Sequence, residues 1–470
     1  MNMLNYAKIA CITCFAMLLY GQTPGLNIFV FAIVSGLCVF GLRNVFRRNA
    51  MFAYLLFLAG ACSVFIYGNA LSYITCIIAF MLFGGQLAFP GKAIAFAMMP
   101  GLANLLASFP ARIAKVVEPH RHDETKGDRM MGRIIKILVI SFVLFIFMML
   151  YMNSSAGFLS FIDSIDIKAP NYQFWLLLLV GAFICQSVFQ PADPSMLQAF
   201  VPEKGERISE KDKGGTKWLS WGTSLLIALN ALIIIVIISD ISFIVSGTVA
   251  GQTPAFFSKL VHEGVASLVF SVILAMLILF IFFEGRINFV KGNMLAKRLA
   301  YIWIACNFCL LILTFYKNGL YISEAGLTYR RIGVWYYLAA LGLGLVFMYL
   351  KIKQDLNILL VIRKTLPVYL LLLVVSSLAP WELMVTRHNL KQAETRGERP
   401  DIEYLSTLDG NNMHLLRPYV KTVSKGNRYF DYYDKELATR QYVLNVRSKH
   451  LLSMVLAEQW AAAELEKTSR

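Results

Sequence analysis

The stretch ILVISFVLFIFMMLYM, residues 137–152, decides the fold class, because its apolar side chains follow one another without interruption by charge. A strand of a transmembrane β-barrel would instead alternate apolar and polar residues over about ten positions. A helix that crosses the ~30 Å hydrocarbon core needs about 17–25 mainly apolar residues, which a stretch of this kind supplies. The sequence therefore predicts an all-α membrane protein.

Composition extends this prediction to the whole chain. Of the 470 residues, 58% are hydrophobic and 15% are charged, and the mean hydropathy is +0.61. Soluble domains are about 45–50% apolar and about 25% charged. We expect a polytopic domain, residues 1–381, with about eleven transmembrane helices. The expected spans lie near 4–20, 26–42, 51–67, 70–89, 134–152, 172–190, 218–238, 264–283, 299–316, 333–350 and 366–381.

Positive charge predicts the orientation of these helices. Loops on one side of the expected bundle contain 24 Lys and Arg residues, and loops on the other side contain 5. Cationic side chains are retained on the cytoplasmic side during insertion. We therefore expect a cytoplasmic N-terminus and, after eleven crossings, a C-terminus outside. The net charge of +16 then reflects topology, and no nucleic-acid partner is expected. The basic loops are 43–50, 91–136, 191–217, 284–298 and 351–364, and the others are 21–25, 68–69, 153–171, 239–261 and 317–332.

Residues 382–470 are predicted to form a small helical domain outside the membrane. Apolar residues at helical spacing flank a D-G turn at 409–410, and LLSMVLAEQWAAAELEK, residues 451–467, is typical of an amphipathic helix. About ninety residues bury only a marginal core. We expect this domain to rest on the membrane domain or on an envelope protein partner, while membrane lipids contact the spans.

The loop at 91–117 differs from the other expected loops. It is moderately apolar, is interrupted by Pro100 and Pro110, and ends with Arg112 and Lys115. Prolines at this spacing disfavour a regular span, because they interrupt the backbone hydrogen bonds that lipid demands. An interfacial helix and a re-entrant helix both fit the pattern.

The sequence predicts no metal site and no cofactor. All eight cysteines lie inside expected spans, and a thiol in hydrocarbon is held protonated. None of the six histidines lies in the middle of a span, which disfavours haem ligation. The run HRHDE at 120–124 gathers ligand types, but Arg121 repels a cation. No Asp, Glu, Lys or Arg is placed deep in a span, which disfavours ion-coupled transport.

The expected outer loop at 317–332 is the exception to the positive-inside tendency. It contains YISEAGLTYRRI, with Glu324, Arg330 and Arg331 close together. One interpretation is an outward-facing site for an anion, such as a lipid phosphate or a carboxylated glycan, with arginine as the donor.

The alternative for the same loop is structural. In this alternative an arginine of the loop forms an ion pair with Glu324, or with another outer carboxylate such as Asp163, Asp166 or Asp240.

Local backbone signals complete the set of candidate residues. Gly326 suggests a turn with an unusual backbone conformation. Thr328 is expected to cap the helix that follows, which places the arginines in a first turn that disfavours cations. Anion-binding candidates are Arg330, Arg331, Glu324 and Thr328, and structural candidates are Gly326 and Tyr321.

A family resemblance rests on this loop and on the segment after the last span. The pattern Y-I-S-x-x-G-L-T-x-x-R in 321–332, T-R-H-N-L at 386–390 and D-I-E-Y-L at 401–405 resemble bacterial multispan membrane proteins catalogued only as a domain of unknown function. The resemblance covers about 290–410 and brings no established activity. Glu324 and Ala325 depart from the family's usual Y-G-L-T form. We take Arg330 as the recurring arginine and expect a specific acceptor for it, with Arg331 more solvated.

Two functional hypotheses follow. No catalytic constellation is recognised, which favours a non-enzymatic envelope scaffold or sensor that engages a partner through its outer tail. The alternative is a membrane enzyme or a lipid-handling protein that uses Arg330 and Arg331 on an anionic head group.

Overall fold

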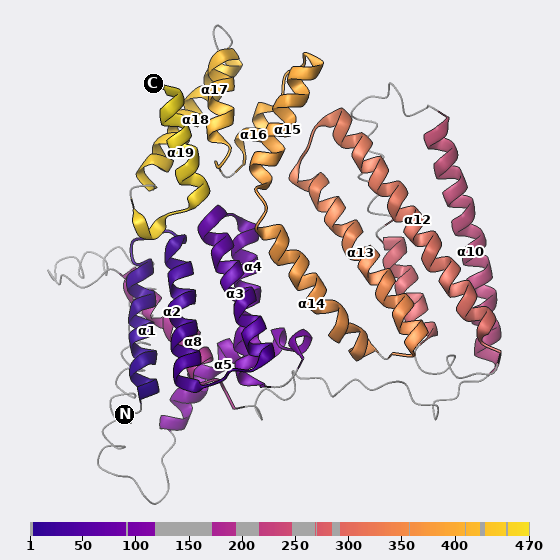
Figure 1. Ribbon diagram of the computed structural model, residues 1–470, viewed down its shortest axis with the longest axis horizontal. Coiled ribbons are helices and arrows are strands. Elements are labelled where there is room, and N and C mark those ends of the chain that lie inside the picture. The colour runs from indigo at the N-terminus through magenta and orange to yellow at the C-terminus, as the bar shows by residue number, and fades with distance from the viewer. Residues whose placement is uncertain are drawn as a thin grey trace, which may run out of the picture. The chain divides into compact units, whose positions relative to one another are not determined.

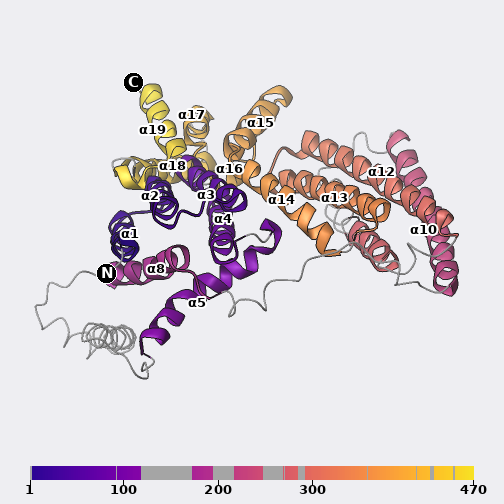
Figure 2. The ribbon, with the colours of Figure 1, turned by 60° about the horizontal axis from the view of Figure 1, so that its bottom comes forward.

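All regular elements in the described part of the chain are helices, as the computed structural model shows (Figures 1 and 2). This confirms the predicted all-α class. The described residues are 3–90, 93–117, 172–193, 216–246, 268, 270–283, 292–356, 358–408, 410–423, 428–447 and 450–469.

The chain forms two compact units. Unit 1 comprises Met1–Val201, Val374–Leu378 and Tyr442–Ala463. Unit 2 comprises Pro202–Leu373, Ala379–Gln441 and Glu464–Arg470. The residues after the last expected span therefore contribute to both units.

Seven helices in the described ranges are long and apolar enough to cross a membrane. Three shorter apolar helices accompany them, and all ten overlap expected spans. The chain is thus a polytopic helical membrane protein, and the expected span near 134–152 lies outside the described residues. The seven are Leu26–Arg43, Arg48–Tyr67, Ala70–Ala88, Leu219–Ser242, Met294–Ala325, Tyr329–Gln354 and Leu360–Ser377, and the three are Met3–Leu19, Gln173–Phe189 and Phe270–Phe282.

In unit 1, small residues allow the helices to approach closely. α1 packs on α2 and α8, and α3 packs on α2 and α4. A Cβ atom added at Gly60 of α3 would lie 2.9 Å from the Cα atom of Cys76 in α4, so only a glycine permits this spacing. The elements are α1 (Met3–Leu19), α2 (Leu26–Arg43), α3 (Arg48–Tyr67), α4 (Ala70–Ala88), η1 (Ile94–Phe96), α5 (Met98–Val117) and α8 (Tyr172–Phe189).

Helix α5 lies across the unit rather than alongside α2 to α4 (Figure 1). Pro110 lies within it without ending it. The buried Asn104 donates to the main-chain oxygen of Ser187 at 2.8 Å and accepts from the N–H of Ala192 at 2.8 Å, at the end of α8. Asn104 thus fastens α5 to the end of α8.

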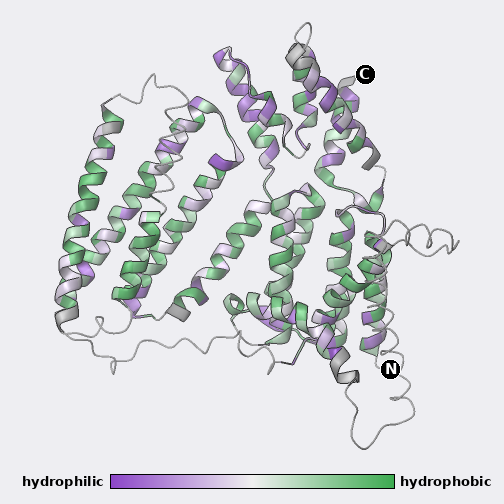
Figure 3. Cartoon of the chain, turned by 180° about the vertical axis from the view of Figure 1, so that it is seen from behind, coloured by the Kyte–Doolittle hydropathy of each residue, from purple (hydrophilic) through white to green (hydrophobic). Residues whose placement is uncertain are grey.

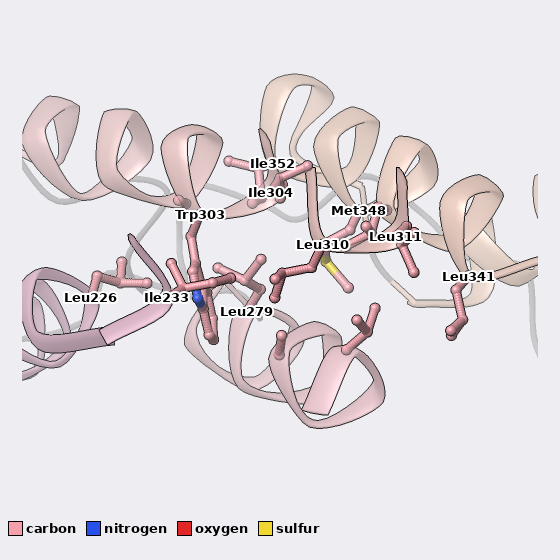
Figure 4. Packing of buried hydrophobic residues seen from close by; sticks show 14 of the residues in the cluster. Leu226, Ile233, Leu279, Trp303, Ile304, Leu310, Leu311, Leu341, Met348 and Ile352 are labelled. Carbon is pink, nitrogen blue, oxygen red and sulfur yellow. The ribbon is translucent and has the colours of Figure 1, made fainter. Parts of the chain in front are cut away.

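Unit 2 is centred on an apolar cluster formed by α10, the helix Phe270–Phe282, α12 and α13 (Figure 4). Ile233 of α10, Leu279, Trp303 of α12 and Met348 of α13 belong to it. The labelled elements are α10 (Thr216–Val245), α12 (Met294–Ala325), α13 (Tyr329–Gln354) and α14 (Ile358–Ser377).

Helix α12 is longer than a membrane is thick. Its 32 residues extend about 48 Å at ~1.5 Å per residue, against a hydrocarbon core of ~30 Å. The predicted loop at 317–332 is therefore wrong in extent, because α12 continues to Ala325 and α13 begins at Tyr329. Near this end, Lys317 pairs with Asp240 of α10 at 2.7 Å.

Lys351, which the sequence predicts in a loop at 351–364, is a buried residue of α13. Its Nζ donates to the main-chain oxygen of Phe283 at 3.1 Å and lies 5.0 Å from the centre of the Phe280 ring.

The residues after α14 form polar helices, which appear purple and white in Figure 3, whereas α10 and α12 are largely green. The predicted helix at 451–467 begins later than expected, because 451–453 form a separate turn, η4, before α19 starts at Leu456. The elements are α15 (Trp381–Arg396), α16 (Ile402–Ser406), α17 (Met413–Val423), α18 (Arg428–Arg447), η4 (Leu451–Ser453) and α19 (Leu456–Ser469).

Candidate functional site

The connection between α12 and α13 consists of three residues. Gly326 has φ +79°, a backbone conformation that favours glycine, and its N–H donates to the main-chain oxygen of Ile322 at 2.9 Å. Thr328 Oγ1 accepts from the N–H of Arg331 at 3.4 Å. The expected turn at Gly326 and the expected cap by Thr328 are therefore both present.

Asn389 of α15 holds this connection through its side-chain amide. Its Oδ1 accepts from the N–H of Leu327 at 2.6 Å, and its Nδ2 donates to the main-chain oxygen of Leu327 at 2.8 Å. The side chain of Asn389 thus satisfies the main-chain N–H and the main-chain oxygen of Leu327, whose own side chain is buried. A Cβ atom added at Gly326 would lie 2.7 Å from Asn389 Oδ1, so the contact depends on the glycine.

Two further residues of α15 contact the last turn of α12. Gln392 Nε2 donates to the main-chain oxygen of Ser323 at 2.5 Å, and Arg396 Nη2 donates to the same oxygen at 2.6 Å. Arg396 also pairs with the carboxylate of Glu324 at 3.2 Å. Asn389, Gln392 and Arg396 are three and seven positions apart, which places them on one face of α15.

Helix α16 reaches the first residue of α13. The hydroxyl oxygen of Tyr404 accepts from the N–H of Tyr329 at 2.9 Å, and Asp401 caps α16 through its Oδ1. Burial raises the pKa of Tyr404, while the Tyr329 N–H and the charge of Arg331 act in the opposite direction. The phenol therefore stays protonated and keeps its own O–H for a further acceptor.

Arg331 is engaged inside the connection. Its Nη1 donates to the main-chain oxygen of Ala325 at 2.5 Å and to that of Gly326, and its guanidinium lies 3.9 Å from the centre of the Tyr321 ring. Asn318, which is fully buried, donates to the main-chain oxygen of Arg331 at 3.0 Å.

Arg330 is exposed, and it has no hydrogen-bond or ion-pair partner among the residues that the structure describes. Our prediction that Arg330 is held and Arg331 is solvated is therefore wrong. In the pattern G-L-T-x-x-R the arginine follows the threonine by three positions. Counted from Thr328, it is therefore Arg331, the arginine that the structure shows in contact with the connection.

Glu324 forms an ion pair, as the structural alternative predicts, but its partner is an arginine other than Arg330 or Arg331. Glu324 pairs with Arg396, and Asp240 pairs with Lys317, whereas Asp163 and Asp166 lie outside the described residues. Sequence analysis missed Asn389, Gln392, Arg396 and Tyr404. For Asn389, Gln392 and Arg396 the signal was their spacing along α15, which a water-exposed helix face would also produce.

The arrangement forms a joint between the α12–α13 connection and the helices α15 and α16. Side chains of α15 and α16 contact main-chain groups of Ser323, Leu327 and Tyr329. The charged groups of Glu324 and Arg331 have contacts within the protein. Within the described ranges, no group of His, Cys, Asp and Glu is arranged to hold a metal ion. HRHDE at 120–124 lies outside those ranges.

The three stretches that carry the family resemblance meet at this joint. Asn389 comes from T-R-H-N-L, Tyr404 from D-I-E-Y-L, and both contact Y-I-S-x-x-G-L-T-x-x-R.

No curated protein and no solved structure matches the chain. One family model, described as Domain of unknown function (DUF4153), matches residues 7–418 and thus includes all three stretches. The chain therefore belongs to the DUF4153 family.

Proposed function

We propose that this protein is a non-enzymatic scaffold or sensor of a bacterial inner membrane, and that its tail, residues 382–470, is a docked extramembrane element that engages an envelope partner. The observation that carries the proposal is the Asn389–Leu327 pair. Asn389 satisfies both main-chain groups of Leu327, in the connection between two apolar helices, and thereby holds the polar helix α15 in a fixed orientation toward α12 and α13.

The topology that we propose has about eleven crossings, a cytoplasmic N-terminus and an external tail. Two groups of contacts support it. In unit 2 the tail contacts 323–329, and in unit 1 it contacts 22–26. Both regions belong to the expected loops that are poor in Lys and Arg, and within each unit the tail segment lies beside the loop that it contacts.

The second candidate is a protein that handles an anionic lipid or glycan. The exposed Arg330 favours it, because its guanidinium keeps its donors for an external carboxylate or phosphate. Glu324, Thr328 and Arg331 do not add to such a site, since each has an internal contact.

Docking of the tail is tested with Asn389→Ala in the full chain, reconstituted in native lipid. We expect faster hydrogen exchange in α15 and α16. We also expect that the variant no longer restores the phenotype of a strain from which the gene has been deleted. Lys391→Ala is the matched control, because Lys391 is exposed on the same helix and its side chain has no hydrogen-bond or ion-pair partner within the described residues. Unchanged exchange and full complementation by Asn389→Ala would contradict the scaffold.

The two candidates are separated with Arg330→Ala. A scaffold predicts normal complementation and the same lipids retained in native mass spectrometry. A head-group site predicts loss of anionic lipid or glycan and loss of function, while α15 stays protected from exchange. An alkaline phosphatase fused after residue 400 tests the topology, and an inactive fusion would exclude an external tail.

A further inference from the structure

Residues 453–455 are fastened to the connection between α1 and α2. The N–H of Thr23 donates to Ser453 Oγ at 3.0 Å, and Ser453 Oγ donates to Gln22 Oε1 at 2.6 Å. The N–H of Leu26, the first residue of α2, donates to the main-chain oxygen of Met454 at 2.9 Å.

Two glycines make room for this segment. A Cβ atom at Gly25 would lie 2.6 Å from the main-chain oxygen of Met454. A Cβ atom at Gly68, at the end of α3, would lie 2.9 Å from Val455 Cγ2. Ser453 and Val455 are accordingly buried. The segment thus lies directly on the ends of α2 and α3.

The length of α2 fixes the depth of this contact. Its 18 residues extend about 27 Å, which does not exceed a hydrocarbon core of ~30 Å. A helix of this length can cross only if both of its ends lie at the boundary between hydrocarbon and head groups. Met454, hydrogen-bonded to the first residue of α2, therefore lies at that boundary too.

Aromatic residues mark the same boundary independently. Tyr20, at the end of α1, and Trp175, near the start of α8, are exposed, and the Tyr20 ring packs edge-on against Phe174. Residues 20–25 and 67–73 contain no Lys or Arg. Exposed Tyr and Trp at the ends of apolar helices are typical of the membrane interface.

Large, exposed apolar side chains flank the fastened segment. Leu451 is 68% exposed and Leu456 is 40% exposed. In a domain surrounded by water these side chains would lose the free energy of burial. At the boundary defined by α2, lipid is within reach to cover them.

We propose that residues 451–456 are an interfacial membrane anchor, and that Leu451 and Leu456 insert among the lipids of the leaflet next to the α1–α2 connection. The partner of this surface is the bilayer itself. The anchor requires that α2 crosses the membrane, and it is independent of any protein partner of the tail.

The test places the photo-crosslinking residue benzoylphenylalanine at single positions of the full chain in proteoliposomes, with lipid adducts detected by mass spectrometry. Ile77, exposed in the middle of α4, is the positive control, and Thr439, exposed on α18, is the negative control. We expect lipid adducts at 451 and 456 at a level comparable with 77, and none at 439. Size-exclusion profiles confirm that each variant is folded.

Two results would overturn the anchor. The first is an absence of lipid adducts at 451 and 456 while 77 is labelled. The second is crosslinking of these positions to a second copy of the chain or to another protein. Neither result bears on Asn389 and the joint in unit 2, so failure of the anchor and failure of the scaffold remain distinguishable.

Discussion

Arg331, in the first turn of α13, donates a hydrogen bond to the main-chain oxygen of Gly326. A cation in a first turn is repelled by the positive end of its own helix dipole. The neighbouring helix resolves this conflict, because the last carbonyl groups of α12 carry partial negative charge and lack helical partners. The Tyr321 ring adds a cation–π contact at 3.9 Å. Two adjacent helix ends are thus joined by one side chain.

The first prediction compares the two adjacent arginines. Arg331→Ala removes a charged donor from two carbonyl groups, and a bond of this kind contributes about 1.5–3 kcal/mol. Arg330→Ala changes an exposed side chain and should alter stability by less than about 0.5 kcal/mol. Thermal unfolding of the purified protein, followed by tryptophan fluorescence, measures both. Equal effects of the two substitutions would show that the carbonyl contacts of Arg331 contribute nothing.

The second prediction concerns Asn389. Asn389→Ala leaves the N–H and the carbonyl of Leu327 without partners, at a cost of about 1–3 kcal/mol for each group that stays buried. Asn389→Asp keeps the acceptor but loses the donor, so it should retain part of the stability. The order wild type, Asn389→Asp, Asn389→Ala in unfolding temperature is expected. A loss in Asn389→Asp as large as in Asn389→Ala would locate the effect in the donor alone.

The third prediction concerns Gly326. Alanine at this position meets both a positive φ and the side chain of Asn389. We expect Gly326→Ala to destabilise the joint by at least about 1–2 kcal/mol, since strained backbone costs about 1–3 kcal/mol. Gly319→Ala is the control, because a Cβ atom there meets nothing within 4 Å. In the double variant Gly326→Ala/Asn389→Ala the two losses should not add, because the same contact is removed twice.

The fourth prediction is a pH dependence of the tail. Burial lowers the pKa of His414 below its ordinary 6.5, and the charge of Arg387 acts in the same direction, while Glu464 opposes it. Burial also lowers the pKa of His388. The folded tail therefore favours neutral imidazoles, and the unfolded tail binds more protons once the pH falls below about 6.5. The stability that the neutral histidines contribute is present above about pH 6.5 and is lost as the pH falls through their lowered pKa values in the folded tail.

The measurement is hydrogen exchange of α15 and α17 at about pH 7.5 and about pH 5.5, corrected for intrinsic rates. We expect weaker protection at the lower pH, and a smaller difference in the variant His388→Gln/His414→Gln. If the double variant loses protection as strongly as the wild type, the histidines do not control the dependence.

Hydropathy located the helices of the membrane domain but not their ends. α12 continues through Lys317, Ser323 and Glu324, where the apolar stretch has already stopped. Apolar content reports the solvent that a segment meets, whereas a helix continues into water as long as its backbone hydrogen bonds do. This is why the expected loop at 317–332 contracts to the three residues between Ala325 and Tyr329.

The candidate site was predictable in position but not in the role of each arginine. Adjacent residues on a helix point about 100° apart, and the placement of Tyr321 and of the α12 carbonyl groups decides which one faces inward. The role of Asn389 could not be predicted from the sequence for a different reason. Its contact with Leu327 joins positions 62 residues apart, and local periodicity carries no information about such a partner.

Fastening Ser453 to Gln22 has a consequence for biosynthesis. The two residues are separated by 431 positions, which at ~5–20 residues per second corresponds to a delay of about 20–90 s. The first helices of unit 1 therefore enter the membrane long before the segment that completes their outer end has left the ribosome. During this interval the N–H of Leu26 and the hollow beside Gly25 and Gly68 are open to chaperones and proteases. A nascent chain that stalls or is cut before residue 453 would then be recognised as unfinished at its N-terminal half.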